Sequence, residues 1–86
     1  MKKAAEDGDA ASQWALGIQY ESGQGVPQNF IKAYVWYSLS AAQGELLWEL
    51  ASSARDDIGG KLAPSDLVIA QALAEKCFES NYKDCD

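Results

Sequence analysis

The chain has 86 residues, a formal net charge of −6, two cysteines and no histidine. A chain of this size holds at most one domain, and its acidity argues against a nucleic-acid partner, because binding to phosphate backbones rests on clustered lysine and arginine. No stretch approaches the ~20 consecutive apolar residues of a membrane-spanning helix, so membrane insertion is not expected. Helix formers predominate and no alternating run indicates a strand, so we predict an all-α fold.

The first element in chain order is the segment 1–8. Residues 4–9 (AAEDGD) are echoed by residues 40–45 (SAAQGE), which aligns Gly8 with Gly44 and gives a period of 36 residues (44 − 8 = 36). Repetition at such a period is typical of stacked helix pairs. Residues 1–8 are therefore interpreted as the remnant of a preceding repeat.

A full unit of helix, loop and helix is predicted over residues 9–44. Asp9 is a candidate N-cap for a helix over 10–20, since its carboxylate can accept from the free N–H groups of the first turn. Two glycines and a proline in 21–28 end that helix. A second helix, capped by Asn29, carries apolar residues at helical spacing to about position 42.

The second unit, residues 45–80, repeats this plan with weaker punctuation. A third helix is expected from Glu45 to about Ile58, and a loop over 59–64 follows it. The apolar face of the third helix comprises Leu47, Leu50, Ala51 and Ala54. A fourth helix begins at a cap formed by Ala63 or Ser65. Its apolar stripe comprises Leu67, Ala70, Leu73, Ala74 and Cys77. About four helices are predicted in all, with a short irregular tail over 81–86.

One group of residues in the first unit follows a fixed pattern. It consists of a Leu-Gly pair, a Tyr three residues later, a Gly-x-Gly-Val turn, an Ala-x-x-Trp segment and a small residue before a closing Gly. These positions are Leu16, Gly17, Tyr20, Gly23, Gly25, Val26, Ala33, Trp36, Ala41 and Gly44. The pattern resembles the Sel1-like repeat, a relative of the tetratricopeptide repeat. Ser12 and Ser40 depart from it, each where alanine is favoured.

The resemblance implies an α/α superhelix, or solenoid, of antiparallel helix pairs. Small residues such as Gly17 let the helix axes approach closely, while Tyr20 and Trp36 fill the remaining space. Residues 45–80 lack the Leu-Gly pair and the Gly-x-Gly turn, so they resemble a degenerate C-terminal capping repeat.

Residues that could carry catalysis are sparse in this chain. The absence of histidine removes the commonest general base and the commonest transition-metal ligand. Paired carboxylates occur in 6–7, 56–57 and 84–86, but they lie at expected helix ends or in the tail and not beside an apolar pocket. We therefore predict no enzymatic activity, no metal site and no cofactor.

Cys77 and Cys85 are not arranged as Cys-x-x-Cys, which argues against a thioredoxin-like role. They are either two idle thiols or one disulfide that pins the tail to the fourth helix. The spacing permits closure if the chain turns back near residues 80–81. Related Sel1-like proteins with cysteines are exported, so a bonded pair implies a periplasmic or secreted protein and free thiols imply a cytoplasmic one.

The resemblance also implies a scaffold or adaptor that binds a protein or peptide, as Sel1-like proteins do in bacterial envelope, secretion and signalling assemblies. The first helix of each pair is expected to present the binding surface. Trp48 and Trp14 are candidates to line it, and Trp36 is expected in the core. The candidate partner contacts are Gln13, Trp14, Gln19 and Glu21. Self-association through the N-terminal repeat is also expected. The alternative is an accessory C-terminal cap of a larger protein whose activity lies in preceding sequence.

Overall fold

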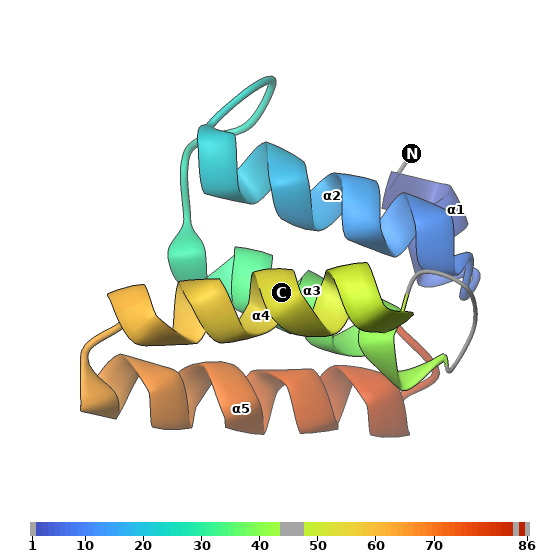
Figure 1. The fold of residues 1–86 in the computed structure, drawn as a ribbon. Helices are drawn as coiled ribbons and strands as arrows, with labels where there is room; N and C mark the ends of the chain where they lie inside the picture. The colour runs from blue at the N-terminus through green and yellow to red at the C-terminus, as the bar shows by residue number, and fades with distance from the viewer. Residues whose placement is uncertain (1, 44–47, 84, 86) are drawn as a thin grey trace.

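The computed structural model describes residues 2–43, 48–83 and 85, which form five α-helices and no strand. These are α1 (Lys2–Glu6), α2 (Ala10–Ser22), α3 (Phe30–Ala42), α4 (Trp48–Lys61) and α5 (Pro64–Glu79). Figure 1 shows α2 and α4 running in one direction, α3 running the opposite way behind them, and α5 antiparallel to α4. The all-α prediction is confirmed, and α1 adds a helix to the four predicted.

The core is built around α3, which packs against α2, α4 and α5. Most of this helix is apolar, and its middle is buried on nearly all sides, as expected of a helix surrounded by others. Its buried residues are Ala33, Tyr34, Val35, Trp36, Tyr37, Leu39 and Ser40. The arrangement places α2 and α4, the first helices of the two pairs, on neighbouring sides of α3.

The contact between α2 and α3 depends on Gly17. A Cβ atom at this position would lie 2.6 Å from Cδ1 of Tyr37, so only glycine leaves room for the tyrosine ring. Leu16 and Tyr20 are buried on either side of this point. The Leu-Gly pair and the following Tyr therefore form one close-packed seam of the first helix pair.

The N-terminal ends of the two helices in the first pair lie after the predicted capping residues, but one of the two caps differs from the prediction. The side chain of Asn29 accepts a hydrogen bond from the backbone N–H of Lys32 at 3.1 Å, as an N-cap should. Asp9 occupies the N-cap position of α2, but its carboxylate accepts from the hydroxyl of Ser12 at 2.6 Å and from no backbone N–H. The predicted backbone cap by Asp9 is therefore wrong.

The end of α4 differs from the prediction. The helix continues to Lys61, so Gly59 and Gly60 are helical and the connection to α5 is shorter than expected. Ile58 is fully buried at this point. A Cβ atom at Gly59 would lie 3.4 Å from Cε2 of Tyr34, so the helix passes close to α3 here. Packing against α3 thus outweighs the weak helix propensity of the two glycines.

The beginning of α4 is only partly comparable with the prediction. Glu45 and Leu47, and the predicted helix end at Gly44, lie outside the described residues. Leu50 was predicted on the buried face, but it is 55% exposed. The reason is that Ala51 faces the interior. Consecutive residues of a helix point in different directions, so the preceding residue, Leu50, points away from the interior.

The start of α5 settles the choice between two predicted caps. Ala63 occupies the N-cap position and Pro64 follows it as the first helical residue. Proline is favoured there because a backbone N–H at the first helical position has no partner within the helix, so the lack of this group in proline costs no hydrogen bond. The buried side of α5 includes Ala70 and Cys77, both from the predicted stripe.

The second helix pair does not pack like the first. The 36-residue period aligns the residues of α2 that face α3, which are Gln13, Leu16, Gly17 and Tyr20, with Glu49, Ser52, Ser53 and Asp56 of α4. This face of α4 is polar, so it provides no apolar seam for α5. The backbone of α5 accordingly lies closest to α3.

Candidate functional site

The C-terminal ends of α2 and α4 meet over the surface of α3. Glu21 of α2 accepts a hydrogen bond from the hydroxyl of Tyr37 at 2.6 Å with one carboxylate oxygen. Its other oxygen lies 4.0 Å from Nζ of Lys61 on α4. The same lysine lies 5.7 Å from the ring centroid of Phe30. These contacts link the C-terminal ends of α2 and α4 to each other and to α3.

The helix period shows which other side chains share this surface. Trp14 and Ile18 precede Glu21 by seven and three positions, so they lie on the same side of α2. On α4, Leu50 and Ala54 precede Lys61 by eleven and seven positions (61 − 50 = 11, 61 − 54 = 7), so they lie on the side of Lys61. We name the resulting surface the inter-helix face. It comprises Trp14, Ile18, Glu21, Leu50, Ala54 and Lys61.

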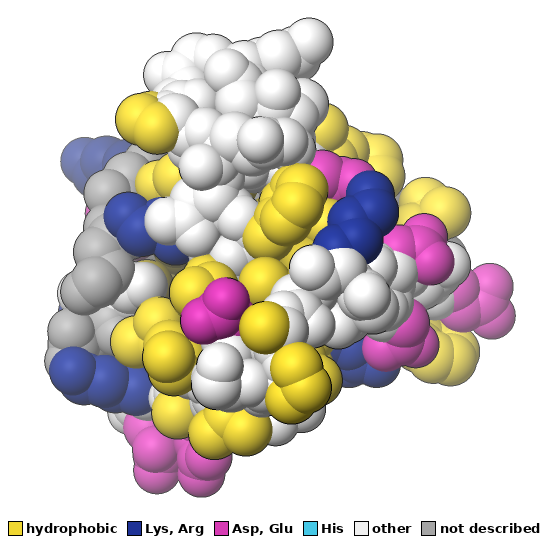
Figure 2. Space-filling view, turned by 90° about the vertical axis from the view of Figure 1, so that its left-hand side faces the viewer, with side chains coloured by type: hydrophobic (Ala, Val, Ile, Leu, Met, Phe, Trp, Pro, Cys, Tyr) yellow, Lys and Arg dark blue, Asp and Glu magenta, His cyan; other side chains and the backbone are white. Residues whose placement is uncertain are grey.

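The inter-helix face mixes apolar and charged groups. Trp14, Ile18 and Ala54 are half-buried and pack against the core, whereas Leu50 is mostly exposed. Figure 2 views the molecule from the end at which α2 and α4 finish, and it shows hydrophobic side chains interspersed with acidic and basic ones. Such a surface offers apolar contact area together with charges that orient a partner.

The four predicted partner contacts do not lie together. Trp14 and Glu21 lie on the inter-helix face. Gln19 is half-buried and precedes Glu21 by two residues. At about 3.6 residues per helical turn, this separation places the two side chains on nearly opposite sides of α2. Gln13 is fully buried.

The burial of Gln13 has a structural cause. Its Nε2 donates to the backbone oxygen of Ala5 at 3.0 Å, and its Oε1 accepts from Nε2 of Gln43 at 3.4 Å. The side chain therefore joins α1 to α2 and to the end of α3. This corrects the predicted surface role of Gln13, which in the structure is that of a satisfied buried amide.

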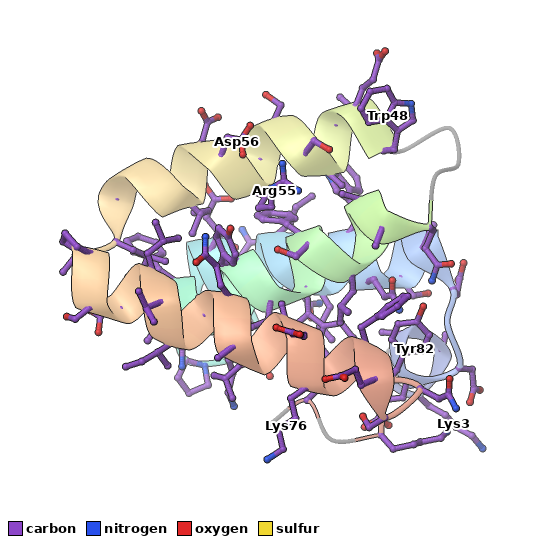
Figure 3. All side chains as sticks on the ribbon, turned by 90° about the horizontal axis from the view of Figure 1, so that it is seen from below. Lys3, Trp48, Arg55, Asp56, Lys76 and Tyr82 are labelled. Carbon is purple, nitrogen blue, oxygen red and sulfur yellow. A yellow bond between two sulfur atoms is a disulfide. The ribbon has the colours of Figure 1, made fainter. Side chains whose placement is uncertain are left out.

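Sequence reasoning missed Leu50 and Lys61 as residues of this surface. Leu50 was assigned to the core, and no local signal showed that Lys61 would approach Glu21, forty positions earlier in the chain (61 − 21 = 40). Trp48, a predicted candidate, is 50% exposed at the start of α4, where Figure 3 labels it. It lies two positions from Leu50 and hence on another side of the helix. Trp36 is fully buried in α3.

The hydroxyl of Tyr37 is electrostatically perturbed. Burial raises its pKa above the ordinary value near 10, and the hydrogen bond to Glu21 and the negative charge of that carboxylate raise it further. All three causes disfavour the phenolate, so the hydroxyl acts as a donor to Glu21. Its role is to hold α2 on α3.

The raised pKa predicts a loss of stability in alkali. A group whose pKa is higher in the folded chain contributes stability below its unfolded pKa and loses that contribution as pH rises. The free energy of unfolding should therefore fall more steeply from about pH 9 to about pH 11.5 in the wild type than in Tyr37→Phe. Urea titrations across that range measure both slopes. Parallel slopes would contradict the assignment.

Cys77 and Cys85 are paired as a disulfide in the structure, with their Cα atoms 4.4 Å apart. Ala5 and Gln13, which are also eight residues apart, precede them by twice the repeat period (77 − 5 = 72, 85 − 13 = 72) and are joined by the hydrogen bond described above. The Cys77–Cys85 pair and the Ala5–Gln13 pair thus join equivalent positions of the repeat. One crosslink is covalent and the other is a hydrogen bond.

Two further features bear on function. Within the described part of the chain, no group of three or more His, Cys, Asp or Glu side chains is arranged to hold a metal ion. Among the helices that the structure describes, none combines the length and apolar character needed to cross a membrane.

Antiparallel helices joined by short loops, with a central helix packed by its neighbours, define a helical-hairpin repeat protein. Residues 10–45 match the family model of the Sel1 repeat. The chain therefore contains a Sel1 repeat over these residues. Sel1 repeats generally mediate protein–protein interaction, and the family is typically non-catalytic. Neither the curated proteins nor the solved structures include a match to this chain.

Proposed function

We propose that this protein is an adaptor that binds a protein or peptide partner on the inter-helix face. The observation that carries the proposal is the exposure of Leu50, at 55%, next to the half-buried apolar residues of the same face. A contiguous apolar patch rimmed by polar residues marks an interaction site, and we propose that Leu50 and its half-buried neighbours form such a patch. No catalysis of its own is part of this proposal.

The charged residues of the face have a defined role in this proposal. Glu21 is partly held by Tyr37, so its carboxylate is positioned before a partner arrives. Lys61 lies 4.0 Å from this carboxylate, and its side chain is more than half exposed, so a partner can reach it while it is paired with Glu21. A positioned charge lowers the ordering cost of binding.

A photo-crosslinking experiment tests the proposal. Benzoylphenylalanine placed at Leu50 of the full-length protein should capture a partner, whereas the same group at Val68 should not. Val68 is a matched control because it is 63% exposed and lies on α5, away from the inter-helix face. Capture that is lost with Trp14→Ala in the Leu50 background supports the proposal. Equal capture from both positions, or from neither, contradicts it.

The cellular location and the oligomeric state are parts of the same proposal. The Cys77–Cys85 pair supports an oxidising compartment, so a periplasmic or secreted location belongs to the proposal. Self-association through the N-terminal repeat stays a prediction.

A further inference from the structure

The residues after α5 fold back onto the turn between α1 and α2. The ring of Tyr82 lies against Gly8, where a Cβ atom would be 3.2 Å from Cε2 of the tyrosine. Nε2 of Gln43 donates to the Tyr82 hydroxyl at 3.0 Å and to the backbone oxygen of Gly8 at 2.9 Å. Figure 3 shows Tyr82 at the corner of the molecule that also carries Lys3 of α1. The tail therefore joins the two ends of the described chain.

Two residues of the tail have a left-handed backbone conformation that an unconstrained segment would not keep. Asn81 and Tyr82 have φ angles of 57° and 67°. This left-handed region is unfavourable for residues with a Cβ, and tyrosine lacks the short polar side chain that makes asparagine tolerant of it. Such a conformation persists only where surrounding contacts hold it.

The cysteine pair supports those contacts, together with the ring of Phe78, whose centroid lies 6.2 Å from that of Tyr82. Cys77 is fully buried near the end of α5, and Cys85 is 6% exposed. Between them the backbone N–H of Tyr82 donates to the carbonyl oxygen of Cys77 at 2.8 Å. The exposed ion pair of Lys83 with Asp7, at 3.8 Å, adds little. The covalent bond is thus the strongest constraint on where the Tyr82 ring lies.

We infer that the Cys77–Cys85 pair is a redox-sensitive clamp that holds Tyr82 on the junction of α1, α2 and α3. Reduction by a dithiol breaks the sulfur–sulfur bond with two electrons and two protons, leaves two thiols on the protein and converts the dithiol to its own disulfide. The tail then relaxes from its left-handed conformation and Tyr82 leaves Gly8 and Gln43.

Release of Tyr82 reaches α1 through a chain of hydrogen bonds. Gln43 loses one partner and is then held by Gly8 and by the longer contact to Gln13. Gln13 in turn holds the carbonyl oxygen of Ala5. A five-residue helix such as α1 is not stable without tertiary contacts. Reduction is therefore expected to loosen α1 and leave α3, the buried centre, unchanged.

Hydrogen exchange of the full chain, with and without dithiothreitol, tests the clamp. Reduction should accelerate exchange of segment 2–9 by about tenfold or more while segment 30–42 keeps its rate. The variant Tyr82→Ala, with the cysteines intact, should accelerate 2–9 without reductant. The double variant Cys77→Ala/Cys85→Ala should exchange like the reduced protein and ignore dithiothreitol.

Three results would overturn the clamp. The first is equal exchange of 2–9 in the oxidised and reduced protein. The second is faster exchange of 30–42 along with 2–9, because that would make the bond a general stabiliser. The third is two reactive thiols in the denatured, unreduced protein.

Discussion

Replacing Trp36 by alanine is expected to lower the free energy of unfolding by roughly 3–5 kcal/mol. The side chain is 0% exposed and lies in the middle of α3, the helix against which α2, α4 and α5 pack. Its removal leaves a cavity. To fill it, the helices that surround α3 would have to move inward. In a domain of this size such a loss approaches the whole stability.

Urea denaturation followed by circular dichroism measures the effect. Trp48→Ala is the matched control, because Trp48 is 50% exposed and its loss should change stability by no more than about 1 kcal/mol. If Trp36→Ala does not fold, Trp36→Phe gives a smaller and measurable loss. Equal costs at positions 36 and 48 would refute the central role of Trp36.

The first helix pair could be predicted because its signals are local. Asn29 caps α3 from the preceding position, and Gly23 ends α2 with φ of 76°, a value that favours glycine. Trp36 is at a pattern position and is buried. Each of these depends on residues within a few positions, which is the range over which sequence patterns inform.

The second pair was predicted less well because its geometry depends on distant residues. Gly59 and Gly60 favour a loop by themselves, but α4 continues through them where Ile58 and Gly59 pack against the core and Tyr34. Tyr34 is twenty-five positions earlier (59 − 34 = 25). Likewise Leu50 is exposed because its neighbour Ala51 is the residue that α4 turns to the interior.

The candidate site was predicted in part for the same reason. Gln13 and Trp14 are neighbours on α2, and the sequence offered no way to tell which one faces the interior. Gln13 is buried because a carbonyl oxygen of Ala5 and an amide of Gln43 satisfy it. A buried amide is affordable only with such partners, and these come from outside the helix.

Replacing Gly17 by alanine is expected to destabilise the protein by roughly 1–3 kcal/mol. The new Cβ would lie 2.6 Å from Cδ1 and 2.7 Å from Cε1 of Tyr37. That ring cannot move aside easily, because it is 1% exposed and its hydroxyl is bound to Glu21. The cost therefore exceeds the gain of up to about 1 kcal/mol that alanine brings to a helix.

Gly60→Ala is the control that separates these two effects. Gly60 is also helical, but a Cβ there meets no atom within 4 Å. Alanine should therefore stabilise the protein at position 60 by about 0.5–1 kcal/mol, the opposite sign to position 17. A double-mutant cycle completes the test: Tyr37→Leu removes the ring, so adding Gly17→Ala to it should cost less than in the wild type. Additive costs would show that the Tyr37 ring is not what excludes a side chain at position 17, and that the seam between α2 and α3 is held in another way.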